Sequence, residues 1–199
     1  GLSQQQLLLA ASRVSGTPPS ALCGHQLHGT GTPLGDPIEL SALASALATS
    51  GGPATVLLTA AKTRVGHSEA GAALSGLADA LCVLDGAPAP VTLHLRACNA
   101  HVAGALGRAG GAALQPARQA GAAIPRMRPG LAGATVSSFA FQGSNAHGTA
   151  SESAPDAGRL RGATEVRTQE LVRCWCAVSP HGLQRCAGTG ADGAMYETR

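Results

Sequence analysis

Three short segments of the sequence combine side chains that can do chemistry with glycines that leave room for a ligand. Residues 28–39 read HGTGTPLGDPIE, residues 62–67 read KTRVGH, and residues 137–147 read SSFAFQGSNAH. The imidazoles of His28 and His67 could donate hydrogen bonds to one oxygen atom that gains negative charge during a reaction, provided that both rings are neutral. The sequence therefore indicates a site for oxyanion chemistry to which all three segments contribute.

Further polar groups lie in the first two segments. Lys62 carries a positive charge that could orient a carboxylate or shift the pKa of a neighbouring group. Thr30 and Thr32 offer hydroxyls to a ligand that carries amide groups. The glycines beside them tolerate backbone angles that a side chain forbids, so a ligand can approach the chain closely.

Two common kinds of catalytic loop are excluded by their missing signatures. The glycine spacing of residues 29–35 misses the dinucleotide fingerprint, and no Walker lysine follows it. No G-x-S-x-G occurs, which excludes the nucleophile elbow of α/β-hydrolases. A single histidine is more often a surface residue or a satisfied core residue than a catalytic one. This is our interpretation of His25, His94, His101 and His181.

The elements that must position the three segments follow from the apolar pattern. A short buried strand is predicted directly before the first segment, and a nearly continuous apolar strand, buried on both faces, before the second. A third strand runs into the last segment. Ligands gather beyond the carboxyl ends of such strands, so neighbouring strands would bring the segments together. The predicted helices are 3–15, 36–48 and 69–84, and the strands or extended segments are 22–27, 54–61, 88–95 and 133–141.

Two details complete this expected layered α/β domain. Asp36 can cap the second helix, Pro37 suits its first turn, and Glu39 can reach back as in a capping box. Residues 62–67 are predicted to be a loop, and residues 102–130 to be irregular with at most one strand.

Length and composition fit one domain followed by a tail. The chain has 199 residues, of which 44% are hydrophobic and only 2% aromatic, so Ala, Leu and Val must build the core. We assign residues 1–150 to the domain. Residues 151–199 become polar and unpatterned, which predicts a poorly structured, disordered linker or tail.

Charge, cysteines and hydropathy exclude several classes of protein. The formal net charge of +3 is too small and too scattered to indicate a nucleic-acid partner. Six cysteines without framework spacing favour a reducing compartment. No transmembrane run or signal peptide is found, so no membrane association is predicted, and cytoplasm and organelle both stay open. The chain begins with Gly1 rather than Met, which indicates a fragment.

The three segments, in order and spacing, also match one known family. HGTGTPLGDPIE, KTRVGH and SSFAFQGSNAH resemble the C-terminal half of the β-ketoacyl synthases, above all the ketosynthase domains of polyketide synthases. The resemblance covers residues 1–150. It implies half of the thiolase fold, in which two similar α/β halves form a five-layered αβαβα sandwich.

This resemblance implies a reaction and its partners. Ketosynthases carry out a decarboxylative Claisen condensation between an acyl thioester and a malonyl-type extender, in polyketide or fatty acid biosynthesis. The extender hangs on the phosphopantetheine arm of an acyl carrier protein, and a cysteine of the N-terminal half holds the acyl group. The implied partners are therefore the carrier protein, the N-terminal half and a second copy in a homodimer. Neither a bound cofactor nor a metal is implied for the chain itself.

The same resemblance gives roles to individual residues. His28 and His67 match the two histidines that assist decarboxylation and bond the extender's thioester oxygen, and Lys62 matches the lysine that supports them. Thr30 and Thr32 match residues that bind the phosphopantetheine arm.

The third segment departs from the family in its gate. Phe141 matches the gating phenylalanine, whose backbone N–H helps to form the oxyanion hole. Glycine is usual in the family where this chain has Ala140 and Gln142. If either position needs a positive φ, Gln142 would strain the loop or hold it in one state.

The nucleophile of the family has no counterpart in this sequence. No cysteine here has the small, Ser-rich context that the family uses, and Cys23 is better interpreted as a buried strand residue. The thiolate must then lie outside this chain, and we expect the chain alone to be inactive.

Two alternatives from other functional classes stay open. Cys174, Cys176, His181 and Cys186 come within one residue of zinc-knuckle spacing, which would make the tail a module that binds single-stranded nucleic acid. The chain could also be a non-catalytic half-domain that pairs with a partner ketosynthase.

Overall fold

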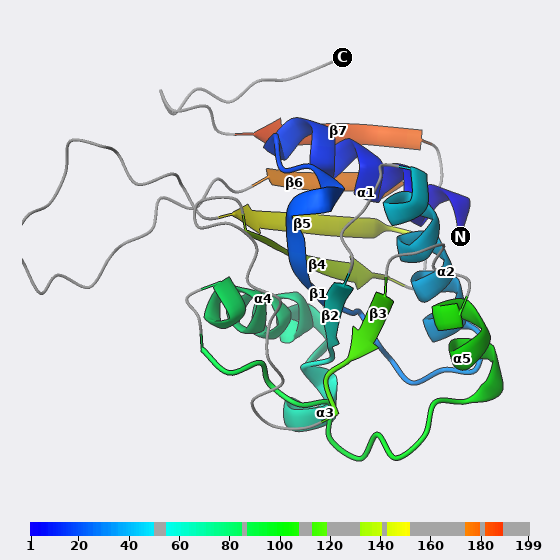
Figure 1. Cartoon of the computed structure of the whole chain (residues 1–199). Helices are drawn as coiled ribbons and strands as arrows, with labels where there is room; N and C mark the ends of the chain where they lie inside the picture. Colours follow the sequence, from blue (N-terminus) through cyan, green and yellow to red (C-terminus); the bar gives the residue numbers. More distant parts are fainter. Residues whose placement is uncertain are drawn as a thin grey trace, which may run out of the picture.

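The computed structural model describes residues 1–49, 55–84, 87–107, 113–118, 132–140, 143–151, 174–179 and 182–188, the last two as backbone only. Figure 1 shows one sheet with helices packed against it. The helices are α1 (Leu2–Ser15), α2 (Gly35–Thr49), α3 (Lys62–Val65), α4 (Ala72–Leu84) and α5 (Ala100–Gly107), with 3-10 turns η1 (Pro19–Ala21) and η2 (Glu69–Gly71). The strands are β1 (Leu22–Gln26), β2 (Thr55–Thr59), β3 (Ala113–Pro116), β4 (Gly133–Phe139), β5 (Asn145–Ser151), β6 (Cys174–Ser179) and β7 (Gly182–Gly188).

The order of the strands brings the candidate segments to one edge of the sheet. The order is β3-β2-β1-β4-β5-β6-β7. β1 pairs in parallel with β2 on one side and with β4 on the other, while β4 pairs antiparallel with β5. Parallel neighbours have their carboxyl ends at the same edge, so the chain leaves β1, β2 and β4 close together.

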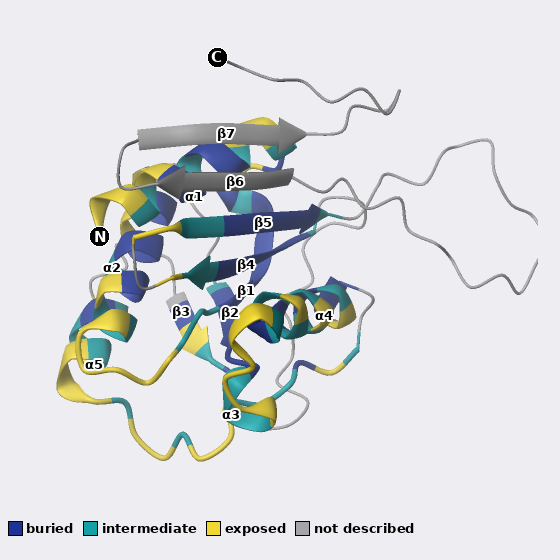
Figure 2. Ribbon diagram, turned by 180° about the vertical axis from the view of Figure 1, so that it is seen from behind, coloured by how far each residue is buried: buried dark blue, intermediate teal, exposed yellow. Residues whose placement is uncertain are grey.

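Two separate cores lie on the two faces of the sheet. One consists of Leu43 and its neighbours in α2 with residues of α1 and α5, packed on Val56 and Leu58 of β2. The other joins Ala80 and Val83 of α4 to the strands. Alternate residues of β2 thus serve opposite faces, as strand geometry requires. Figure 2 shows the resulting burial of the central strands between the helices.

Most predicted elements are confirmed, with small shifts of their ends. The helix predicted at 3–15 is α1, and Gly16 ends it in the left-handed conformation with φ 66°. The helices predicted at 36–48 and 69–84 correspond to α2 and to η2 followed by α4. The strands predicted before the first two segments are β1 and β2.

Three stretches differ from the predictions. The predicted loop at 62–67 contains the one-turn helix α3. Residues 88–95 form no strand, although Thr92 N donates to Ala117 O at 2.8 Å. The stretch predicted as irregular, 102–130, contains most of α5, whose Ala105 is fully buried. It also contains the strand β3, which agrees with the single strand allowed for this stretch. Alanine and glycine give these short elements little periodicity, and their packing partners α2 and β2 decide their structure.

The tail also contributes to the sheet. We predicted a poorly structured tail over residues 151–199, but the structure places two strands within it. β6 pairs antiparallel with β5, and β7 pairs antiparallel with β6. Without β6, the edge of β5 would have unpaired backbone N–H and C=O groups. Pairing with these groups explains why a sequence with little pattern adopts strand structure there.

A buried polar cluster lies between β1, β4 and β5. His25 Nδ1 is 2.7 Å from Thr135 Oγ1, and Ser137 Oγ is 3.0 Å from His147 Nδ1. The two imidazoles are stacked, with ring centroids 5.8 Å apart. Burial lowers the pKa of His25 to about 3, and burial together with His25 lowers the pKa of His147. His25 is therefore a satisfied, neutral core residue, as we expected.

This cluster predicts that acid weakens the fold. An unfolded chain protonates His25 near pH 6.5, whereas the folded chain does so only near pH 3, so the contribution of His25 is present above about pH 6.5 and is lost as the pH falls toward 3. We expect the free energy of unfolding of the His25→Asn variant to depend less steeply on pH between 6 and 4, by up to about 1.4 kcal/mol per pH unit. Urea unfolding followed by circular dichroism measures this, and His94→Asn, at an exposed position, should keep the original slope. An unchanged slope in His25→Asn would show that His25 is protonated in the folded state.

Candidate active site

The loops after β1 and β2 and the end of β4 bring three aromatic side chains together. The ring centroids of His28 and His67 lie 5.9 Å apart in an edge-to-face arrangement. The ring of Phe139 lies 5.5 Å from that of His28. His28 is half-buried and His67 is exposed, so the pair borders solvent. The structure thus brings the two predicted histidines into one place, although they are far apart in the sequence.

Both histidines have their Nδ1 atoms engaged by donors. Lys62 Nζ lies 3.3 Å from His28 Nδ1 and also donates to His28 O at 2.6 Å. The backbone N–H of Glu69 donates to His67 Nδ1 at 3.1 Å. Because a lysine ammonium and a backbone N–H can only donate, each Nδ1 accepts, and each neutral ring carries its proton on Nε2. The arrangement therefore supplies two Nε2–H donors.

The charge of the site favours neutral His28. Burial, followed by the positive charge of Lys62 and the neighbouring His67, lowers the pKa of His28 to about 4. Burial also lowers the pKa of Lys62, although the nearby Glu39 and Asp36 oppose this. His28 consequently stays a neutral hydrogen-bond donor at physiological pH.

Glu39 of α2 binds the backbone of the loop that begins at His28, a role that the sequence did not reveal. Its Oε1 accepts from His28 N at 2.7 Å and its Oε2 accepts from Gly29 N at 3.0 Å. Burial raises the pKa of Glu39 to about 7, although these two hydrogen bonds and Lys62 act in the opposite direction. The carboxylate therefore fixes the backbone that carries the His28 ring.

The predicted capping box at the start of α2 is wrong. Thr32 Oγ1 accepts from Gly35 N at 3.0 Å, while Asp36 Oδ1 accepts from Gly31 N at 3.2 Å. Gly29 and Gly31 have φ of 50° and 75°, and this turns their N–H groups toward the helix. The carboxylates of Asp36 and Glu39, near the start of α2, accept from loop donors instead of from the helix backbone. An acidic pair on one turn after a glycine-rich loop is the signal that could have indicated this.

Thr30 and Thr32 lie on the exposed side of the same loop. Their hydroxyls are 3.5 Å apart, and both residues are exposed. Thr32 has one hydroxyl lone pair occupied by Gly35 N–H and can still donate to a ligand.

The structure describes only part of the predicted gate around Phe141. Phe141 and Gln142 lie outside the described residues. Ala140 is exposed, its N–H donates to Ser144 O at 2.8 Å, and Gly143 takes the positive φ of 79° that closes the turn. Phe139, at the end of β4, contacts the ring of His28.

The zinc-knuckle alternative falls largely outside the described residues. His181 is not described, and only the backbone is described at the three cysteines of that spacing, where Cys176 and Cys186 are opposite each other in β6 and β7. Elsewhere in the described part of the chain, no cluster of His, Cys, Asp or Glu could hold a metal ion. Cys23 is buried in β1 and donates to Gly133 O, which agrees with its interpretation as a strand residue.

The chain has clear counterparts among known proteins. Residues 1–96 match the family described as β-ketoacyl synthase, C-terminal domain. One component of the phenolphthiocerol/phthiocerol polyketide synthase of Mycobacterium tuberculosis is 36% identical over 156 residues, which is 78% of this chain and 7% of that protein. The polyketide synthase GfsA of Streptomyces halstedii is 32% identical over 179 residues, 88% of this chain and 2% of GfsA.

Solved structures give the same result. The oxazolomycin ketosynthase domain OzmH KS7 of Streptomyces albus superposes with a TM-score of 0.67 at 26% identity, over 82% of this chain and 28% of that one. A ketosynthase from module 6 of the bacillaene synthase of Bacillus subtilis has the same TM-score, 0.67, over 77% of this chain and 26% of that one. The sheet and its helices therefore define the C-terminal half of a thiolase-like condensing enzyme.

The sequence relatives make this class more specific. The chain contains the C-terminal domain of a ketosynthase, of the kind found in polyketide synthases. It spans about a quarter of the solved ketosynthases named above and less than a tenth of the two curated relatives. Among the described residues, no helix is both long and apolar enough to cross a bilayer.

Proposed function

We propose that this chain supplies the decarboxylating part of a ketosynthase that performs a decarboxylative Claisen condensation. The observation that carries the proposal is the edge-to-face pair of His28 and His67, at 5.9 Å, with both Nδ1 atoms engaged by donors. Two Nε2–H groups at the mouth of one loop cluster are suited to hold a single carbonyl oxygen.

In this mechanism the two rings bind the thioester carbonyl oxygen of a malonyl-type extender. The bond between the extender's Cα and its carboxylate breaks, and carbon dioxide leaves. The electron pair moves into the carbonyl group and makes an enolate, whose oxygen is stabilised by the two Nε2–H donors. The enolate carbon then attacks the acyl thioester of a cysteine outside this chain, and that sulfur leaves as a thiolate.

The other site residues support this step. Burial, with the positive charge of Lys62, lowers the pKa of His28 and keeps the ring neutral, and Lys62 holds its Nδ1 as an acceptor. Thr30 and Thr32, exposed at the mouth, would bind the amides of a phosphopantetheine arm. Phe141 would gate the acyl channel and contribute its backbone N–H to the acyl oxyanion.

The partners follow from the part of the reaction that this chain lacks. The extender arrives on the phosphopantetheine of an acyl carrier protein, and no cofactor is bound by the chain itself. The N-terminal half supplies the cysteine, and the complete ketosynthase would be a homodimer.

Release of carbon dioxide from a malonyl thioester tests the proposal. We expect the chain alone to show no condensation, and we expect its combination with a matching N-terminal half to take up acyl groups and to decarboxylate malonyl-carrier protein. A reconstituted protein with an intact cysteine that does neither would contradict the catalytic proposal and favour the non-catalytic half-domain.

A further inference from the structure

Both ends of the helix α3 carry groups of the site. Lys62 begins this single turn, and Gly66 and His67 follow it directly. Residues 65–70 are all exposed, so packing contributes little to the position of the His67 ring. The hydrogen bonds that fix α3 must therefore decide where His67 lies relative to His28.

The first half of α3 is fixed by His28, which follows β1, by Ala60, which follows β2, and by Leu93. Lys62 Nζ donates to His28 O, and Thr63 Oγ1 donates to Ala60 O at 2.8 Å. Thr63 Oγ1 also accepts from Leu93 N at 3.1 Å. These contacts leave the turn free to tilt about its N-terminal end unless its second half is also held.

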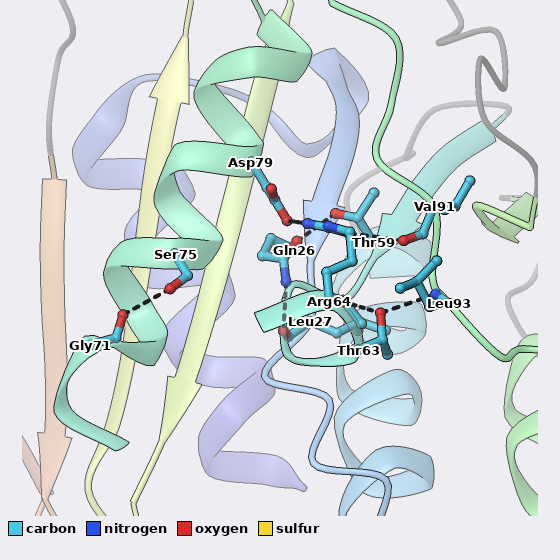
Figure 3. A network of polar contacts seen from close by, with 11 residues as sticks. Gln26, Leu27, Thr59, Thr63, Arg64, Gly71, Ser75, Asp79, Val91 and Leu93 are labelled. Carbon is cyan, nitrogen blue, oxygen red and sulfur yellow. Dashed lines mark hydrogen bonds and ion pairs between the residues drawn. The ribbon is translucent and has the colours of Figure 1, made fainter. Parts of the chain in front are cut away.

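Arg64 holds the second half in two directions at once. Its Nη1 donates to Val91 O at 2.8 Å, and its Nη2 forms an ion pair with Asp79 of α4 (Figure 3). α4 is packed on the sheet, and the segment with Val91 lies beside β3 through the bond of Thr92 to Ala117. The guanidinium thus ties α3 to two separate parts of the fold.

The chemistry of this contact requires arginine. The two side chains of the ion pair are only 21% and 17% exposed, so water screens them weakly. A planar guanidinium presents donors in a fixed fork and can serve a carboxylate and a carbonyl at the same time. A lysine ammonium is a single point on a flexible stem and would give up one partner or the geometry of both.

We propose that Arg64 is a positioning residue of the site, which orients His67 toward His28 by fixing α3 to Asp79 and Val91. The inference rests on the proposed function for its catalytic consequence. The path from the guanidinium to the imidazole is short, because only Val65 and Gly66 separate Arg64 from His67. Gly66 has φ 75° and ψ −178°, so the chain turns sharply there and any tilt of α3 redirects the ring.

Hydrogen–deuterium exchange of the full protein tests the contact without any assay of activity. The amides of Val65 and Gly66 are bonded within α3, to Ala61 O and Lys62 O. In Arg64→Lys we expect peptides that cover residues 60–70 to exchange about tenfold faster. The matched control is Arg96→Lys, an exposed arginine that follows Val91 in the same segment, and it should leave this exchange unchanged. Unchanged exchange in Arg64→Lys would overturn the proposal.

Kinetics of malonyl decarboxylation by the full protein test the consequence. We expect Arg64→Lys and Arg64→Met to lower kcat about 10- to 100-fold, because a small misplacement of a catalytic group has such effects. KM should stay within about twofold, since the exposed threonines of the other loop are untouched. Asp79→Asn keeps the bond to Val91 and should lose less, and Arg96→Lys should match the wild type.

The outcomes separate this inference from the proposed function. If the wild-type protein does not decarboxylate, the proposed function fails, and the exchange experiment still decides whether Arg64 holds α3. If the wild type decarboxylates and Arg64→Lys keeps its full kcat, the positioning role is wrong. Equal losses of acyl loading and decarboxylation in Arg64→Lys would also overturn it, because they indicate general damage to the fold.

Discussion

Replacing His67 with alanine should lower malonyl decarboxylation by the full protein roughly 10²- to 10³-fold, the usual effect of removing one oxyanion donor. The Nδ1 of His67 is occupied by Glu69 N–H, so its Nε2–H is the group available to a substrate oxygen. The ring is exposed, and its loss should hardly change the stability of the fold. His28→Ala should lose at least as much, because it removes the other Nε2–H donor and the ring beside Lys62 Nζ.

Matched histidines on the surface provide the control for this experiment. His94 and His101 are exposed and lie outside the site, so His94→Ala and His101→Ala should keep the wild-type rate. In the proposed mechanism, acyl loading of the cysteine in the N-terminal half reports on the other half of the reaction, and we expect it to change little in His67→Ala. A His67→Ala protein that decarboxylates at the wild-type rate would refute the two-donor mechanism.

Replacing Glu39 with alanine should lower the free energy of unfolding by about 2 to 3 kcal/mol, because two buried backbone N–H groups lose their acceptors. Glu39 is only 4% exposed, so water cannot readily replace its oxygens at the N–H groups of His28 and Gly29. The same change should reduce decarboxylation, since these N–H groups anchor the backbone of His28. Urea unfolding and carbon dioxide release measure the two effects.

Two other variants show whether the Glu39 carboxylate is responsible. Glu39→Gln keeps the size of the side chain and one acceptor oxygen, and we expect about half of the loss. Ser45→Ala removes an exposed hydroxyl from the same helix, whose partner is Ser41 O, and should change stability by no more than about 0.5 kcal/mol. If Glu39→Ala unfolds like the wild type, the loop does not depend on this carboxylate.

The sequence was sufficient to predict an element where its local pattern agreed with the packing around it in the fold. A nearly continuous apolar run predicted β2, because a parallel strand between two helical layers is buried on both faces. β1 was predicted as a short strand that runs into the glycine-rich loop. The candidate segments follow these strands directly in the sequence. The proximity of His28, Lys62 and His67 could therefore be predicted from the position of each segment after its strand. Their catalytic roles remain predictions.

The sequence was insufficient where contacts between distant residues decide the structure. Asp36 and Glu39 have the spacing of a capping box, but the inward N–H groups of Gly29 and Gly31 compete for the same carboxylates. Arg64 has a role only because Asp79, on the next helix, and Val91 approach it. No local sequence pattern predicts contacts between residues this far apart in the chain.

The strands of the tail determine where this sheet ends. β6 occupies the hydrogen-bonding groups of β5 along five residue pairs, from Asn145 to Thr149. A strand from a second polypeptide therefore cannot add to β5 while β6 stays in place. Within the described part of the sheet, the terminal strands are β3 and β7. Deleting the tail would return β5 to the boundary and expose an edge that can pair with other chains, so shortened versions of this protein are expected to self-associate.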